Sequence, residues 1–298
     1  MTDEVFELVG PEGQTRRGIL TLPDGGPPQA ALLLLTAGVK YRTGPGQLYV
    51  ALARRLAELG FATLRFDPLC VGESDGSLEA APSHELWLSA ERGRFVADAA
   101  LAYEALERHL GGLTPVFLGG LCGGGLTAQM TAAALPQRPA GLISINIAAR
   151  ETPVPGRPVA VVASESRATL RSYPRKLVSA AAWKRVFTGT TSVRTLATTV
   201  AAILRLKHAP KLDESLNPRF VASLRRTRAL QIPHLLIFSG TDSRWFHFND
   251  LVLGPLFQGE MKGPAHEVRV VPDAEHHLFM PEWRDAAVAW IAEWMRRR

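Results

Sequence analysis

The stretch that most constrains what this chain can fold into is residues 115–126, PVFLGGLCGGGL. Its apolar start predicts a short buried strand, and glycines then surround Cys122 before a helix expected over residues 123–135. Glycine two positions before and after the cysteine leaves space around a strained strand-to-helix turn. The pattern is G-x-S-x-G with cysteine in the serine position. Because a helix dipole favours a thiolate at its N-terminus, Cys122 is a candidate nucleophile.

Three other interpretations of this stretch compete with a nucleophile. The first is a buried structural cysteine among packing glycines. The second is a phosphate-binding loop, but G-x-G-x-x-G does not fit a first strand-to-helix turn here and no G-K-[ST] follows. The third is a zinc site, but the other cysteine of the chain, Cys70, has no ligand-like spacing. The nucleophile hypothesis requires a base, an acid and oxyanion donors elsewhere in the chain.

The alternation of strands and helices predicts the fold class. The expected strands are residues 5–9, 18–22, 30–35, 61–66, 116–118, 141–147, 234–238 and 267–271, and the expected helices are 48–59, 91–110, 123–135 and 281–298. The strand at 30–35 is apolar throughout and ends in a tight bend at residues 36–39. A fully apolar strand is typical of a parallel sheet that is buried on both faces. We therefore expect an α/β fold with a mostly parallel central sheet covered by helices on both faces.

The alternation stops between residues 151 and 228, where positive charge is also concentrated. This segment has 15 Lys and Arg against 4 Asp and Glu, whereas the rest of the chain has 19 against 24. We predict a core formed by residues 1–150 and 229–298, and a basic, partly helical cap over 151–228. Candidate contacts for an anionic partner are Lys40, Arg175, Lys176, Lys184 and Arg185, with Arg225, Arg226 and Arg228. The alternative is a solvated basic surface; no aromatic interleaving or module typical of nucleic-acid binding accompanies the charge.

Length and composition bound the class of protein. The 298 residues are 46% hydrophobic, which is enough for one full α/β core with an insertion. Two cysteines are too few for a disulfide framework and fit a reducing compartment. The acidic start MTDEVFELVG lacks a signal-peptide pattern, and no apolar run approaches the roughly 18 residues of a membrane span. We therefore expect a soluble cytoplasmic protein.

Two loops that follow later strands carry the acid and the base that a cysteine nucleophile needs. In a doubly wound sheet such groups come from loops at the carboxyl ends of the strands. Asp242 comes just after an expected strand, whereas Asp250 and Asp273 do not; the alternative role of Asp242 is to cap the next helix. His276 is the preferred base, and the adjacent His277 is the alternative.

These residues form a complete predicted site. Cys122, Asp242 and His276 occur in the chain order nucleophile, acid, base. The expected oxyanion donors are the backbone N–H of Gly123 and that of Val39 in the bend after the first apolar strand.

On these residues the chain resembles the α/β-hydrolase superfamily over nearly its whole length. Besides the turn at Cys122, Asp67-x-x-Cys70-x-Gly72-x-Ser74 is similar to the superfamily's D-x-x-G-x-G-x-S turn, with cysteine replacing the first glycine. More closely, the chain resembles bacterial cysteine-nucleophile hydrolases that include the exosortase-A-system-associated type. The matching stretches are LLTAGVKYRTGPGQLYVALARRLAELGF, TLRFDPLCVGESDG, GLCGGG and residues 173–206. The G-x-C-x-G box is also shared with dienelactone hydrolases, polyhydroxyalkanoate synthases and acyl shuttles between carrier proteins.

This resemblance implies covalent acyl chemistry on cysteine, and the chemistry of the thioester narrows the donor. An acyl-cysteine is itself a thioester, so accepting an acyl group from a carrier-protein or coenzyme A thioester is nearly thermoneutral, whereas accepting it from an oxyester is uphill. The basic cap fits a phosphopantetheine group or an acidic carrier protein. We expect a cysteine acyltransferase or thioesterase. The alternatives are a hydrolase of activated esters or lactones and a non-catalytic binding protein of the same fold. The sequence indicates no metal and no cofactor, and it leaves the oligomeric state open.

Overall fold

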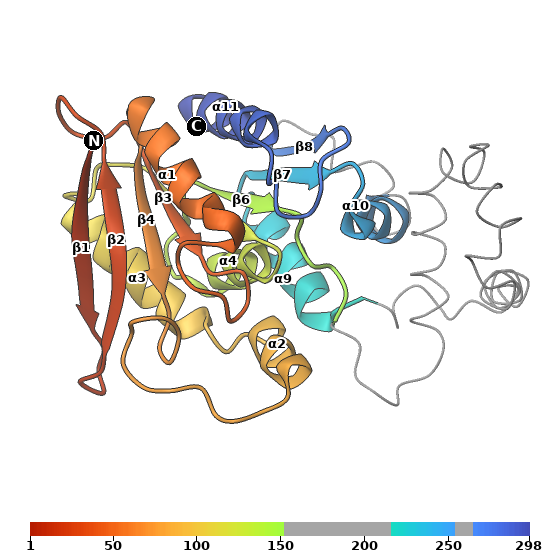
Figure 1. Ribbon diagram of the computed structural model, residues 1–298, viewed down its shortest axis with the longest axis horizontal. Coiled ribbons are helices and arrows are strands. Elements are labelled where there is room, and N and C mark those ends of the chain that lie inside the picture. Colours follow the sequence, from red (N-terminus) through yellow and green to blue (C-terminus); the bar gives the residue numbers. More distant parts are fainter. Residues whose placement is uncertain (152–215, 254–264) are drawn as a thin grey trace, which may run out of the picture.

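A computed structural model describes residues 1–151, 216–253 and 265–298 (Figure 1). Within them lies an eight-stranded sheet in the order β1-β2-β4-β3-β5-β6-β7-β8. The strands are β1 Thr2–Val9, β2 Thr15–Leu22, β3 Ala31–Leu35, β4 Ala62–Asp67, β5 Val116–Leu121, β6 Gly141–Ile145, β7 His234–Ser239 and β8 His266–Val271. β2 is antiparallel to β1 and to β4, and every pair from β4 to β8 is parallel.

Helices cover both faces of this sheet, as the sequence predicts. They are α1 Leu48–Glu58, α2 Ser83–Glu91, α3 Val96–His109, α4 Gly123–Ala134, α9 Pro218–Ala229, α10 Ser243–Phe248 and α11 Pro281–Arg296, with short turns of helix at Pro45–Gln47 and Asn249–Leu253. α1 and α11 pack together on one face, and α3, α4 and α9 lie on the other (Figure 1). All five residues of β3 are buried because both of its faces are covered. The predicted α/β class is confirmed.

One predicted helix is wrong. The sequence pattern predicts a single helix over residues 91–110, but α2 ends at Glu91 and α3 begins at Val96. Gly93 lies between them with a φ of 96°, which is incompatible with a right-handed helix. The chain therefore turns between two helices. Among the described residues, no helix has both the length and the apolar character that crossing a membrane requires.

Most of the predicted cap, residues 152–215, lies outside the described residues, as do 254–264. The end of the predicted cap segment is helix α9, which packs against α4. Its Phe220 and Leu224 are buried in one cluster with Leu126 of α4. The Asn217 side chain caps α9 by accepting from Phe220 N and also donates to Glu91 O at the end of α2. The boundaries of the cap at residues 151 and 228 remain a prediction.

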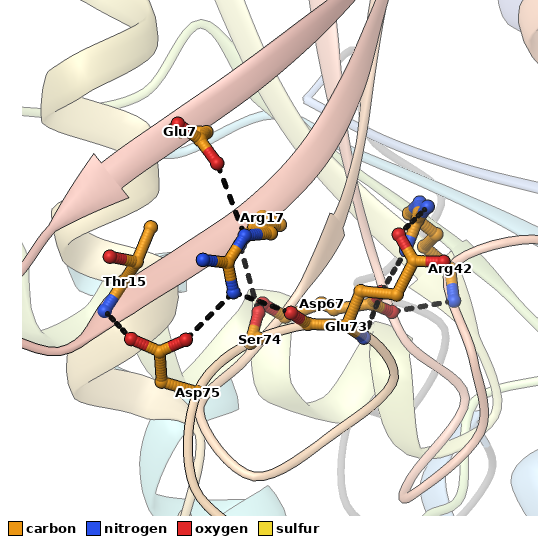
Figure 2. A network of polar contacts seen from close by, with 8 residues as sticks. All are labelled: Glu7, Thr15, Arg17, Arg42, Asp67, Glu73, Ser74 and Asp75. Carbon is orange, nitrogen blue, oxygen red and sulfur yellow. Dashed lines mark hydrogen bonds and ion pairs between the residues drawn. The ribbon is translucent and has the colours of Figure 1, made fainter.

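A buried ion pair anchors the loop that follows β3 (Figure 2). Asp67 ends β4 with no exposed surface, and its Oδ2 contacts the Arg42 guanidinium at 2.5 Å while its Oδ1 accepts from Arg42 N at 2.7 Å. Arg42 also contacts Glu73 at 2.7 Å, and Ser74 Oγ donates to Asp67 O. Pairing is what makes a buried carboxylate tolerable. The turn that resembles D-x-x-G-x-G-x-S thus holds the loop that begins at the predicted oxyanion bend.

Candidate active site

Cys122 lies on the tight strand-to-helix turn that the glycine spacing predicts. It joins β5 to α4 with φ 54° and ψ −115°, which is a strained conformation for a residue with a side chain. A Cβ atom on Gly120 would lie 2.7 Å from Leu35 O, and one on Gly124 would lie 2.3 Å from the same oxygen. Both positions therefore need glycine because the turn passes directly against the end of β3.

The hydroxyl of Tyr49 on α1 holds this turn by two hydrogen bonds to the backbone. Its hydroxyl donates to Leu35 O at 2.9 Å and accepts from Leu121 N at 2.6 Å, so it bridges the ends of β3 and β5 just beyond their last paired residues. The side chain is fully buried. On the other side of β5, Cys122 N donates to Ile145 O at 2.8 Å. These contacts fix the backbone that leads into the cysteine.

The predicted acid and base lie together beside the cysteine. His276 Nδ1 donates a hydrogen bond to Asp242 Oδ2, and the same imidazole lies close enough to the Cys122 thiol for each group to shift the pKa of the other. Asp242 Oδ1 accepts from Arg244 N at 3.0 Å. Asp242 therefore also caps α10, so the alternative role that the sequence suggests for it coexists with the contact to His276.

The electrostatic environment favours the charged forms of Asp242, His276 and Cys122. Burial alone would raise the pKa of Asp242, but its hydrogen bond to His276 and the nearby positive charges hold that pKa below its ordinary value. Burial would lower the pKa of His276, yet the bonds to Asp242 and Cys122 outweigh it and the pKa is raised. Burial would likewise raise the pKa of Cys122, but the charge of Arg244, the bond to His276 and the N–H of Gly123 lower it overall. The site therefore favours a thiolate–imidazolium pair.

His277 lies beside His276 without replacing it. The two rings meet edge to face with centroids 4.7 Å apart, and the ring of His277 also lies 5.2 Å from that of Phe279. Burial and the charges of His276 and Arg244 lower the pKa of His277. In the described part of the chain, the imidazole that is hydrogen-bonded to Asp242 is that of His276. This geometry favours His276 over His277 as the candidate base.

Asn146 anchors the loop that carries His276, a role that the sequence pattern does not reveal. Its Nδ2 donates to Ser239 Oγ and to His276 O, each at 2.8 Å, and its Oδ1 accepts from Ser239 N at 2.7 Å. Ser239 Oγ in turn donates to Glu275 O at 2.9 Å. The only available signal was the position of these polar residues at the carboxyl ends of β6 and β7.

The bend after β3 lies against the turn at Cys122. A Cβ atom on Gly123 would be 3.1 Å from Gly38 N, so the two backbone segments are in contact. Within the described residues, neither Gly38 N nor Val39 N donates to another protein group. The side chain of Val39 packs on a small apolar cluster with Val71. Gly123 and Val39 were predicted as oxyanion donors, and Gly38 is a third backbone N–H beside them.

Of the eight predicted basic contacts, Lys40 lies near the site, four lie outside the described residues, and three lie on α9: Arg225, Arg226 and Arg228. Lys40 Nζ is 5.8 Å from the centroid of the Trp87 ring, which packs on Gly38, and the charge of Lys40 acts on His277. The residues outside are Arg175, Lys176, Lys184 and Arg185. In the segments that the structure describes, no group of three or more His, Cys, Asp or Glu side chains is arranged to hold a metal ion.

A family model described as serine aminopeptidase, S33, matches residues 30–280. This range includes Cys122, Asp242 and His276. The chain belongs to this α/β-hydrolase family. The family description names a serine enzyme, whereas the residue on the turn here is Cys122. No curated protein matches the sequence of the chain.

Solved structures share the fold. A protein from Thermus thermophilus is 20% identical with a TM-score of 0.60, and each chain is covered completely. A dienelactone hydrolase from Anabaena variabilis is 16% identical with a TM-score of 0.55, and 100% of this chain and 99% of that chain are covered. An esterase from Pyrococcus furiosus is 12% identical with a TM-score of 0.59, over 99% of this chain and 91% of that chain. At these identities the likeness shows the fold alone, and the chain has the α/β-hydrolase fold.

Proposed function

We propose that the protein transfers acyl groups through a covalent thioester on Cys122, as an acyltransferase or thioesterase that acts on carrier-protein or coenzyme A thioesters. The observation that carries this proposal is the placement of Cys122 beside His276, which is hydrogen-bonded to Asp242, at the carboxyl edge of the sheet. His276 is the base and Asp242 orients it. The backbone N–H groups of Gly123 and Val39 stabilise the oxyanion.

The reaction has two steps that share one base. The Cys122 thiolate attacks the carbonyl carbon of the donor thioester and forms a tetrahedral oxyanion. The donor carbon–sulfur bond then breaks, and the leaving thiolate takes the proton from His276. In the second step His276 removes a proton from water, an amine or a thiol as it attacks the acyl-cysteine, and Cys122 leaves as a thiolate. Hydrolysis and transfer differ only in the acceptor.

Thioester donors are favoured by the nucleophile itself. The first step exchanges one thioester for another, so neither side of the exchange is favoured strongly. An oxyester donor must instead expel an alkoxide, which is a much poorer leaving group than the Cys122 thiolate. The lowered pKa of Cys122 increases this disadvantage, because a less basic thiolate is expelled more readily from the tetrahedral intermediate. A hydroxyl nucleophile in the same place would carry no such bias.

The basic cap provides a second argument for this class of donor. Residues 151–228 carry 15 basic against 4 acidic side chains, and such a surface attracts a phosphopantetheine phosphate or an acidic carrier protein. We propose that Arg175, Lys176, Lys184 and Arg185 bind that partner, with Lys40 at the entrance of the site. The proposed location is the cytoplasm, where such donors occur.

A hydrolase of activated esters or lactones is the second candidate. It is favoured by the fold shared with a dienelactone hydrolase and an esterase. Such substrates have good leaving groups, so the barrier to acylating Cys122 is lower than for ordinary oxyesters.

Intact-protein mass spectrometry tests the proposal. The protein is mixed with acyl-pantetheine thioesters, beside Cys122→Ala and, as a matched control, Cys70→Ala. We expect an adduct of the acyl mass on the wild-type protein and on Cys70→Ala, and none on Cys122→Ala. Decay of the adduct with and without an added amine or thiol separates transfer from hydrolysis. No adduct and no turnover with any thioester would overturn the thioester proposal, and turnover by Cys122→Ala would overturn the role of Cys122.

A further inference from the structure

A guanidinium group lies beside Asp242, and its one role in the proposed reaction so far is to lower the pKa of Cys122. Arg244 is the second residue of α10, directly after the loop that carries Asp242. Its Nη1 is 3.5 Å from Asp242 Oδ1, and its charge acts on the Cys122 thiol, so the guanidinium lies close to the sulfur. The sequence does not mark this residue, because its chemistry depends on proximity to a cysteine more than a hundred residues away.

Within the described residues, the contacts of Arg244 leave part of its hydrogen-bonding capacity for a ligand. The distance of 3.5 Å to Asp242 is long for a hydrogen bond, and Asp242 Oδ2 is already engaged by His276. A guanidinium presents a planar fork of several N–H donors that suits a carboxylate. The side chain of Arg244 is 34% exposed, so it can receive a ligand close to the reacting sulfur.

The charges around Arg244 also favour an anion. His247 lies one turn further along α10, with its Nε2 3.3 Å from Arg150 Nη1. Burial and the charges of Arg150 and Arg244 lower the pKa of His247 to about 4, so this imidazole is neutral near pH 7. Among the described residues, the acidic groups that act on His247 include Asp242, which is bonded to His276, and Asp250.

We propose that Arg244 binds a carboxylate carried by the acyl group itself, a few bonds from the reacting carbonyl, so that the preferred donors are short acyl thioesters with a terminal carboxylate. This inference rests on the proposed acyl transfer. It assigns Arg244 as a specificity-determining residue for the substrate.

The position of Arg244 distinguishes the acyl carboxylate from the phosphate of the donor. In a phosphopantetheine thioester the phosphate is separated from the sulfur by the whole pantetheine chain, which contains two amide groups and is far longer than an arginine side chain. A guanidinium close to the nucleophilic sulfur therefore cannot reach that phosphate in an extended donor. A carboxylate two or three carbons from the reacting carbonyl lies within its reach.

The test compares two nearly isosteric donors. Succinyl-pantetheine carries the carboxylate, and its succinamoyl analogue carries a neutral amide in the same place; neither contains phosphate. We expect the wild-type kcat/KM to favour the succinyl donor by about 10- to 100-fold, which corresponds to the strength of a charge-assisted pair. In Arg244→Gln the loss of positive charge near Cys122 is expected to slow both donors alike. The succinyl donor is expected to lose its preference in addition, through a higher KM, so that the ratio falls to near unity, with Arg244→Lys intermediate.

Controls keep the outcomes distinct. Arg138 is an exposed arginine that precedes β6 and donates to Gln231 O, and Arg138→Gln is expected to keep the wild-type preference. Thermal melting checks that Arg244→Gln is folded. Equal losses of kcat/KM for both donors in Arg244→Gln, or no preference in the wild type, would overturn the carboxylate site. In that case acylation of Cys122 would still be observed and the proposed function would stand. Absence of any adduct on Cys122 would instead overturn the function.

Discussion

Replacing Tyr49 by Phe tests whether the hydrogen bonds of the Tyr49 hydroxyl hold the turn at Cys122. The change removes only the hydroxyl that donates to Leu35 O and accepts from Leu121 N. Leu121 N–H is then buried without an acceptor, which costs about 1–3 kcal/mol, and the lost bond to Leu35 adds about 1 kcal/mol. We therefore expect Tyr49→Phe to lower the free energy of unfolding by about 2–4 kcal/mol. For a chain of this size that corresponds to roughly 3–6 °C in Tm.

The same substitution is expected to slow acylation. Leu121 precedes Cys122, so a backbone released at this point moves the sulfur relative to His276, and a small misplacement of a reacting atom costs about 10-fold or more in rate. Urea unfolding and thermal melting measure the stability, and the rate of adduct formation by mass spectrometry measures the acylation of the folded protein.

A second tyrosine provides a matched control. Tyr103 donates one hydrogen bond to Glu107 Oε1 at 2.7 Å, and this carboxylate is half-buried, so water replaces the lost partner. Tyr103→Phe is expected to cost less than about 1 kcal/mol and to leave acylation unchanged. Wild-type stability and wild-type acylation in Tyr49→Phe would show that the hydroxyl does not support the turn.

Three further predictions follow from the site. Asp242→Asn is expected to slow acylation by about 10³- to 10⁴-fold because the imidazole loses its orienting carboxylate; single-turnover rates measure this, and a loss below 10-fold would argue against the role of Asp242. The pKa of Cys122 is below the ordinary thiol value of 9.0, so its alkylation by iodoacetamide is expected to rise with pH through a midpoint below 9.0, and in His276→Gln the midpoint is expected to move upward; an unchanged midpoint would contradict the thiolate–imidazolium pair. Gly124→Ala places a Cβ 2.3 Å from Leu35 O, which is expected to lower stability by about 3 kcal/mol; chemical unfolding measures it, and a neutral effect would show that the turn can move.

The sequence was informative where structure is set locally. Glycines at positions 120 and 124 predicted the turn at Cys122 because a tight turn requires residues without a side chain at the neighbouring positions that contact other backbone. Apolar runs predicted the strands because a strand that is buried on both faces of the sheet is apolar at consecutive positions. The interruption of the helix expected over residues 91–110 was missed, because the amphipathic pattern continues through Gly93 although its φ of 96° ends the helix.

The assembly of the site depends on contacts between distant segments, and local pattern carries little information about these. Tyr49 reaches a backbone group 72 residues away, and Asn146 holds the carbonyl of a residue 130 positions along the chain. Nothing in the residues adjacent to Arg244 indicates that its guanidinium lies against Cys122. The sequence by itself determined the α/β class, the strained turn and the candidate nucleophile, acid and base. Only the tertiary structure decided which backbone groups Tyr49 and Asn146 hold and which charge faces the sulfur, because these contacts form when separate strand ends meet at one edge of the sheet.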